Sequence, residues 1–449
     1  MFRNLRTLGA VDILVIGAGS SGCLAALAAA ENKNYSVLMV ERYGFAGGTS
    51  TQMLDTFYGF FTPGEIPKKI VGGLPDIVVN ELDQLGEIFL RPNTYGAGTG
   101  VNYNPERLKN VWDHLLLKAG VNLLLHTVLI DVNQQSNGQY ECIFWNKGGF
   151  WRATPKRVID ASGDADFCHL AGFKYEVAGE VEPAQSMTTT FRMANVDLQE
   201  YELAGGKKML SEKMRATTHP LPRKEGSAHA MNIEKCIATV AVKVAGLNAL
   251  DAGELTLAEI EGRRQSFVFE RFFREEVPGY SYAKIIGLSN QIGVRETRRV
   301  YGEQRLTKED CMAATIPADS VLLCGAPIED HRAGKGGELE TLWQYIPKGG
   351  VYGVPYGALV PSGSGTVWVT GRCFSATHDA HASCRSMAQT MAMGTAVGCA
   401  AAQSLDDDEA ASEVNTSKLR TSLYQLGAVL ETPGSTAFTG KNEWNLNFK

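Results

Sequence analysis

The sequence has 449 residues, of which 44% are hydrophobic and 20% are charged, the composition of a globular protein with a large core. Its net charge is -6, from 43 basic and 49 acidic residues without a long run of either sign, which argues against a nucleic-acid partner. The sequence has no uninterrupted apolar stretch of about 18 residues, so we expect no membrane span and a cytoplasmic protein. The 9 cysteines contain no Cys-x-x-Cys pair, so neither a disulfide framework nor a zinc site is indicated.

The first 40 residues predict a β-α-β unit. Residues 11–16 are a short apolar run, glycines follow, and residues 23–30 are rich in the strong helix formers Ala and Leu. A second apolar run at residues 37–40 predicts the next strand.

Further elements of the same region follow along the chain. Asn104 before Pro105 is typical of a helix start, and apolar residues recur at helical spacing as far as Ala119. We expect strand structure in residues 121–132, and in residues 139–160 a small meander that returns to the main sheet. Residues 366–370 predict a last strand, and the small residues up to 402 predict a last helix.

The pattern changes between residues 185 and 350 to mixed strands and charged helices. We therefore predict an α/β protein with a discontinuous Rossmann-type dinucleotide domain, residues 1–184 and 351–431. An α+β substrate domain, residues 185–350, is inserted into it. Residues 432–449 are polar and predict a loosely held tail.

A Gly-x-Gly-x-x-Gly motif stands directly after the first predicted strand and opens the first predicted helix. Gly17 permits the tight turn, Gly19 lets a pyrophosphate touch the backbone, and Gly22 allows close helix–strand packing. The N-terminus of the helix attracts phosphates. Glu41 ends the next strand, where a carboxylate accepts hydrogen bonds from ribose hydroxyls. In this context the motif predicts a dinucleotide site.

A glycine-rich loop at residues 41–50 favours FAD over a nicotinamide, because a nicotinamide domain usually continues at once into its second half. Four more segments follow in order, at residues 158–166 (VIDASGDAD), 292–299 (IGVRETRR), 354–359 (VPYGAL) and 371–380 (GRCFSATHDA). In these segments the sequence resembles the FAD-dependent oxidoreductase family, which includes iminodiacetate-oxidase-like flavoproteins. The resemblance covers roughly residues 10–430 and implies FAD as the cofactor.

The resemblance also implies which residues bind the adenosine and pyrophosphate half of FAD. They are Gly17, Ala18, Gly19, Ser20, Ser21, Gly22, Glu41, Arg42, Gly47, Gly48, Thr49, Val128, Ala161, Gly163 and Asp164. Val128 would face the adenine through its backbone, and Gly371 and Arg372 would lie near the flavin chain. Asp160 and Asp164 are explained equally well as turn formers.

Arg385 and Gly394 belong to the segment that we expect beside the flavin ring. A reduced flavin carries negative charge, which a cation or a helix N-terminus stabilises. Arg385 and the helix that contains residues 391–398 can supply both. Close packing of this helix against the sheet would explain its small residues as well.

His378 is the predicted proton acceptor, because a neutral imidazole can take a proton from an alcohol or amine while a hydride leaves the adjacent carbon. A hydrogen-bonded structural histidine has the same pattern. His378 and His381 resemble half of a metal site, but no third ligand stands nearby, so we predict no metal.

Arg295 is the third predicted catalytic residue. With Arg298 and Arg299 it forms either an ion-paired structural strand or a site for a substrate carboxylate. Residues 330–332 (Asp-His-Arg) and Tyr356 are further candidates for the lining of the substrate pocket.

Together these features predict oxidation of a small organic substrate at a C–N or C–O bond, by hydride transfer to the flavin and with oxygen as acceptor. One alternative is a flavin-dependent monooxygenase of secondary metabolism. An aromatic hydroxylase would carry its Gly-Asp motif late in the chain, whereas here Gly163-Asp164 is mid-chain and Gly371-Arg372 is late. A non-redox dinucleotide-binding protein is the other alternative. Substrate identity, covalent attachment of the flavin and oligomeric state stay open.

Overall fold

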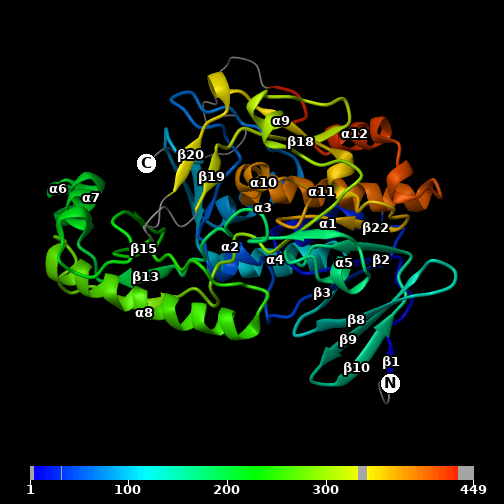
Figure 1. Ribbon diagram of the computed structural model, residues 1–449, viewed down its shortest axis with the longest axis horizontal. Helices are drawn as coiled ribbons and strands as arrows, with labels where there is room; N and C mark the ends of the chain where they lie inside the picture. The colour runs from blue at the N-terminus through cyan, green and yellow to red at the C-terminus, as the bar shows by residue number, and fades with distance from the viewer. Residues whose placement is uncertain (1–4, 32, 332–340, 433–449) are drawn as a thin grey trace.

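The computed structural model describes residues 5–31, 33–331 and 341–432, so the predicted tail lies outside the described residues from 433 onward. A five-stranded parallel sheet lies at the middle of the fold (Figure 1). Its strands, in spatial order, are β22 (Val367–Val369), β11 (Arg157–Asp160), β2 (Ile13–Ile16), β3 (Val37–Val40) and β7 (Asn122–Leu124). All four strand pairs are parallel, so the carboxyl ends of the strands meet at one edge. The predicted α/β class is confirmed.

The sheet is buried on both faces, which is why its strands are continuous apolar runs. Ile13 and Val15 of β2 lie in one core and Leu14 and Ile16 in another. The first core contains helices α1 (Ser20–Ala30), α4 (Pro105–Lys118) and α11 (Met387–Asp406). The second contains side chains of a mixed sheet, β1-β10-β9-β8, in which β1 is parallel to β10 and the other two pairs are antiparallel. Its strands are β1 (Arg6–Thr7), β10 (Gly149–Ala153), β9 (Tyr140–Asn146) and β8 (Val128–Gln134).

Most predicted elements of this region are present. The side chain of Asn104 accepts a hydrogen bond from the Glu106 N–H at 3.1 Å, so the predicted cap of α4 is confirmed. Strands β9, β10 and β11 form the predicted meander and the return to the main sheet. The strand structure expected in residues 121–132 is present as two strands, β7 and β8, which belong to different sheets. His126, with φ of 52°, lies in the turn between them.

A second sheet, β14-β15-β13-β16, lies beside the first and carries the long helix α8, at the lower left of Figure 1. Its elements are β13 (Phe191–Ala194), α6 (Leu198–Leu203), α7 (Gly206–Ala216), β14 (Ser227–Ala230), β15 (Ile237–Val240), α8 (Ala252–Glu276) and β16 (Lys284–Leu288). Phe191, Phe269 and Phe273 belong to a buried cluster formed by residues between 187 and 292.

After this cluster the chain returns to the region of the first sheet and forms further strand pairs. β17 (Arg298–Val300) pairs with β12 (Tyr175–Val177), and β18 (Ser320–Cys324) pairs with β21 (Tyr352–Pro355). Side chains of β18 and β21 share the core of α11. The division at residue 350 stays a prediction.

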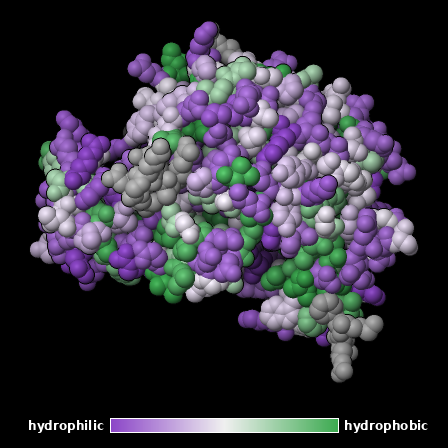
Figure 2. Space-filling view, viewed as in Figure 1, coloured by the Kyte–Doolittle hydropathy of each residue, from purple (hydrophilic) through white to green (hydrophobic). Residues whose placement is uncertain are grey.

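The remaining α-helices and strands have at most 5 residues, except for α3, α10 and α12. They are α2 (Thr49–Gln52), β4 (Thr56–Phe57), α3 (Leu74–Gln84), β5 (Ile88–Arg91), β6 (Gly100–Tyr103), α5 (Asp166–Leu170), α9 (Lys308–Met312), β19 (Ile328–Asp330), β20 (Leu342–Gln344), α10 (His378–Cys384) and α12 (Thr416–Gln425). Figure 2 shows apolar side chains gathered low on this face, between α8 and the sheet β8-β9-β10. Within the described ranges, no helix has the length and apolar character needed to cross a membrane.

Candidate active site

A cavity of about 370 Å³ lies at the carboxyl edge of the parallel sheet. Most of the predicted cofactor-binding residues line it: Gly17, Gly19, Ser20, Ser21, Glu41, Arg42, Gly48, Thr49, Val128, Ala161, Gly163, Gly371 and Arg372. They come from loops after β2, β3, β11 and β22 and from the start of β8. The topology therefore gathers segments that are far apart in the sequence at one edge of the sheet.

Glu41 holds two of these loops together. Its carboxylate accepts hydrogen bonds from the backbone N–H groups of Ala18 at 2.7 Å and Tyr43 at 2.9 Å. The Gly47 N–H donates to the Ala18 carbonyl at 2.7 Å. Ala18 and Gly47 do not line the cavity, and their contacts instead join the first glycine loop to the loop after β3.

Gly22 and Gly394 also lie outside the lining, and both are needed for close packing. A Cβ on Gly22 would stand 2.0 Å from the Gly17 carbonyl oxygen. A Cβ on Gly394 would stand 2.0 Å from the carbonyl oxygen of Ser21, because α11 packs directly on α1. In this structure Gly394 contacts α1, so its role is the close helix packing that the sequence left open.

Asp164 is half-buried beside the cavity and orients two arginines that line it. Arg372 donates to Asp164 at 2.6 Å, and Arg42 lies 3.9 Å from the same carboxylate. Burial opposes ionisation of Asp164, but Arg372 and Arg42 hold its pKa below the usual value. His381 is fully buried and fixes the same loop, since its Nε2 lies 2.7 Å from the Arg372 carbonyl oxygen.

The cavity lining suits the two parts of FAD that carry negative charge, which are the pyrophosphate and the reduced flavin ring. A Cβ on Gly19 would meet no atom within 4 Å, so this part of the backbone faces the cavity at the start of α1. Neither Gly19 nor Ser386, which precede α1 and α11, makes a side-chain cap. The first N–H groups of α1 are therefore available to the pyrophosphate. At α11 the Ala388 N–H already donates to the Tyr58 carbonyl at 3.1 Å, so the flavin ring can use only the other N–H groups of its first turn. Ser386 and Met387 line the cavity.

Four ionisable residues form the wall near the start of α11: Arg295, Glu329, His331 and Arg385. Burial lowers the pKa of His331 to about 3, with a further contribution from Arg295, so this imidazole is neutral at pH 7. Burial opposes ionisation of Glu329, but His331, Arg385 and Arg295 lower its pKa to about 2. The Nε2 of His331 therefore donates its hydrogen to Glu329, at 2.8 Å.

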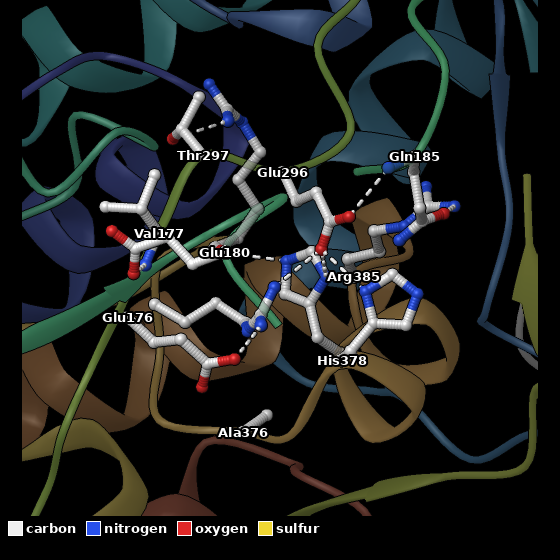
Figure 3. A network of polar contacts seen from close by, with 12 residues as sticks. Glu176, Val177, Glu180, Gln185, Glu296, Thr297, Ala376, His378 and Arg385 are labelled. Atoms are coloured by element: carbon white, nitrogen blue, oxygen red, sulfur yellow. Dashed lines mark hydrogen bonds and ion pairs between the residues drawn. The ribbon is translucent and has the colours of Figure 1, made fainter. Parts of the chain in front are cut away.

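His378 does not line the cavity. It is buried beside Glu296, 3.2 Å from its Nδ1 (Figure 3). Asp330 lies 3.3 Å from its Nε2. Burial alone would lower the pKa of His378, but the two carboxylates raise it to about 10. The imidazole is thus doubly protonated at pH 7 and lacks the lone pair that a proton acceptor needs.

A chain of polar contacts links His378 to the cavity (Figure 3). Glu296 accepts a hydrogen bond from the Gln185 backbone N–H at 2.7 Å, and the Gln185 side-chain oxygen accepts one from Arg385 at 3.0 Å. Glu296 also accepts from Arg299 at 2.6 Å. His378 is therefore placed to hold Glu296, and through it the residue that orients Arg385.

The raised pKa of His378 predicts a pH-dependent stability. Its stabilisation is fully present below about pH 6.5, its ordinary pKa, and is lost as pH rises through about 10, its pKa in the folded protein. We expect wild type to be more stable than His378→Gln at about pH 6, with the difference shrinking steadily up to about pH 10. Urea unfolding of both proteins at several pH values measures this. A constant difference would show that the pKa of His378 is not raised in the folded protein.

Asp330, His378 and Asp379 place possible metal-ligand atoms within 4.8 Å of one another. Both nitrogens of His378 face carboxylates, and Asp379 pairs with Lys308 at 2.8 Å. Ion pairs account for these contacts, so we do not assign a metal to this group.

The three neighbouring arginines have separate environments. Arg298 donates to the Asp164 carbonyl at 2.8 Å, and Arg299 is buried between Glu176 and Glu296, whereas Arg295 lines the cavity.

The sequence did not indicate Glu329. Its neighbours at 330 and 331 were candidates, and this polar run after the apolar strand β18 was the available signal. Arg332 lies outside the described residues, and the buried Tyr356 donates to the Ala411 carbonyl away from the cavity.

Comparison with known proteins agrees with this geometry. Residues 12–423 match the family model described as FAD dependent oxidoreductase, and the chain belongs to that family. The protein is thus an oxidoreductase, and its cofactor is FAD. No curated protein matches the sequence significantly.

Solved structures with a related fold are distant. A geranylgeranyl bacteriochlorophyll reductase-like protein from Thermoplasma acidophilum is 13% identical, with a TM-score of 0.47 and coverage of 95% of this chain and 85% of that chain. The p-nitrophenol 4-monooxygenase PnpA from Pseudomonas putida DLL-E4 is 12% identical, with a TM-score of 0.40 and coverage of 67% and 70%. The flavin-dependent monooxygenase PieE, in complex with FAD and substrate, is 13% identical, with a TM-score of 0.43 and coverage of 89% and 58%.

Proposed function

We propose that this oxidoreductase oxidises a small organic substrate at a C–N or C–O bond, with hydride transfer to the flavin and oxygen as the final acceptor. The observation that carries the proposal is the shape of the cavity. It continues from the dinucleotide loops, past the start of α11, to a wall of Arg295, Glu329, His331 and Arg385. This arrangement leaves a polar space for a small substrate beside the expected position of the flavin ring.

Bound FAD supplies a two-electron acceptor. The substrate carbon loses a hydride and the N–H or O–H group loses a proton, which gives an imine or a carbonyl compound. Oxygen then takes up two electrons and two protons and leaves as hydrogen peroxide. Arg385 and the N-terminus of α11 add positive charge at this end of the cavity, where negative charge develops during reduction.

We assign proton transfer to His331 and a positioning role to His378. With Nε2–H directed at Glu329, the lone pair of His331 is at Nδ1, which lies 3.1 Å from the Thr341 hydroxyl. A proton can reach Nδ1 directly or through this hydroxyl, and Glu329 stabilises the resulting imidazolium. His378, doubly protonated and outside the cavity, lacks both the lone pair and the access.

The second sheet is proposed as the substrate domain. It contributes Val240 from the end of β15 to the cavity wall, and the segment after β16 contributes Gly293, Val294 and Arg295. These residues line the same cavity as the dinucleotide loops. Substrate choice is thus assigned to residues 185–350, the region predicted as an insertion.

The test is anaerobic mixing of the yellow holoenzyme with a panel of amines, amino acids, hydroxy acids and alcohols. We expect at least one compound to bleach the flavin, and admission of air to restore the colour and release peroxide. His331→Gln should retain FAD but slow bleaching by about 100-fold or more. If no compound bleaches the flavin while a reduced nicotinamide does so, the proposed oxidation is contradicted in favour of a monooxygenase.

A further inference from the structure

We propose that the substrate carries a carboxylate, which Arg295 and Arg385 bind together at the polar end of the cavity. This inference rests on the proposed function and narrows it to compounds such as amino acids and hydroxy acids, in which the oxidised C–N or C–O bond stands near a carboxylate.

The two guanidinium groups are held by one short segment. Arg295 donates from Nη1 to the Ser186 carbonyl and to the Thr188 hydroxyl, the latter at 2.8 Å. Arg385 donates from Nη2 to the side-chain oxygen of Gln185 at 3.0 Å. Residues 185–188 therefore fix both groups on the cavity wall. Such preorganisation is what bidentate recognition of a planar anion requires.

Neither arginine is neutralised by a direct ion pair in the described part of the chain. By contrast, Arg298, Arg299 and Arg372 each lie within 3.3 Å of a carboxylate oxygen. The Nε of Arg385 is buried and has no hydrogen-bond partner. A buried donor on a cation is costly unless something accepts from it. Arg385 also lines the cavity, so an anion bound there would lie against this guanidinium group and compensate its buried charge.

The local charge favours an anion. Among the described residues of this wall, Arg295 and Arg385 contribute two positive charges, Glu329 one negative charge and the neutral His331 none, which leaves one excess positive charge. Burial and the neighbouring Arg385 together lower the pKa of Arg295 to about 9. A bound carboxylate would relieve this repulsion. It would also offset the effect of Arg295 on His331, and so make that imidazole a better proton acceptor.

The phosphates of FAD do not explain this pair. Their site is at the start of α1, beside Gly19 and Gly48, at the dinucleotide end of the cavity. Arg295 and Arg385 lie instead beside Glu329 and His331, which have no place in a phosphate site. A carboxylate fits because it is planar, carries one charge and accepts from two donors at once.

The experiment measures binding of propionate and benzoate to the FAD-loaded enzyme, by perturbation of the flavin spectrum and by calorimetry. Propionamide and benzamide, the neutral counterparts, serve as comparison. We expect each carboxylate to bind at least about 10-fold more tightly than its amide. Arg295→Gln and Arg385→Gln should each weaken carboxylate binding by about 10- to 100-fold and retain FAD. Arg263→Gln, on the exposed side of α8, should bind like wild type.

Equal binding of amide and carboxylate, or undiminished carboxylate binding in both variants, would overturn the inference. If only Arg295→Gln loses binding, Arg385 serves the flavin and the two-arginine site is wrong. Binding needs no turnover, so the two proposals fail separately. Carboxylates that bind without any compound bleaching the flavin would contradict only the proposed function. Bleaching by neutral amines or alcohols, without carboxylate binding, would contradict only the carboxylate site.

Discussion

Gly19→Val is expected to give a folded protein that no longer contains FAD. The Cβ position of Gly19 meets no atom within 4 Å, so a larger side chain is accommodated without moving the backbone. It would point into the cavity where the pyrophosphate must touch the loop. We expect FAD binding to weaken by at least about 100-fold, or about 2.8 kcal/mol. The purified variant should be colourless, and its circular dichroism should match that of wild-type protein stripped of FAD.

Two other glycines provide matched controls. Gly9 is exposed and also has open space at its Cβ position, but it lies away from the cavity, so Gly9→Val should stay yellow. A Cβ on Gly394 would lie 2.0 Å from a carbonyl oxygen of α1, so Gly394→Val should lower stability before it affects the cofactor. Full FAD occupancy in Gly19→Val would mean that the pyrophosphate does not lie against this loop.

The cofactor half of the molecule could be predicted because its signals are local. The apolar run, the glycine motif and the small-residue helix are consecutive in the sequence, and each constrains the next. Gly17 and Gly22 show why: each lies too close to neighbouring backbone for any side chain. The role of Gly394 could not be predicted in this way. A glycine in such a helix suits a cofactor or a neighbouring helix, and only the packing of α11 on α1 distinguishes the two.

Arg295, His331 and Arg385 at the ionisable end of the cavity were candidates from the sequence. Their protonation states could not be predicted, because these depend on contacts between distant segments. The pKa of His378 is set by Glu296 and Asp330, on two other segments, and sequence spacing gives no measure of their distance. For the same reason the neighbours Arg295 and Arg299 looked equivalent. The chain after β16 turns one toward the cavity and the other toward Glu176.

Glu296→Ala is expected to cause the largest loss of stability. The Glu296 side chain has no exposed surface and accepts from Arg299 at 2.6 Å, from the Gln185 N–H at 2.7 Å and from His378 at 3.2 Å. Its pKa is lowered to about 2, because His378, His381 and Arg299 outweigh the effect of burial. Truncation would leave buried cations and a buried N–H without their acceptor. The expected cost is about 3–5 kcal/mol in the free energy of unfolding.

The conservative variant separates charge from shape. Glu296→Gln keeps an oxygen that can accept from the Gln185 N–H, but it removes the negative charge shared by Arg299 and His378. We expect it to be less stable than wild type and more stable than Glu296→Ala. Without this carboxylate the pKa of His378 should fall, so the loss of stability above about pH 6.5 should become shallower than in wild type.

Chemical denaturation of the three proteins at about pH 6 and about pH 9 tests these expectations together. Glu106→Ala serves as the control, because Glu106 is 71% exposed and pairs with Lys109 at the surface, where such a pair contributes at most about 1 kcal/mol. If Glu296→Ala costs no more than this control, the buried network is not ionised in the way its geometry indicates. If Glu296→Gln matches wild type at both pH values, the network depends on hydrogen bonds alone. His378 would then be neutral, and its catalytic role would be opposed only by its position outside the cavity.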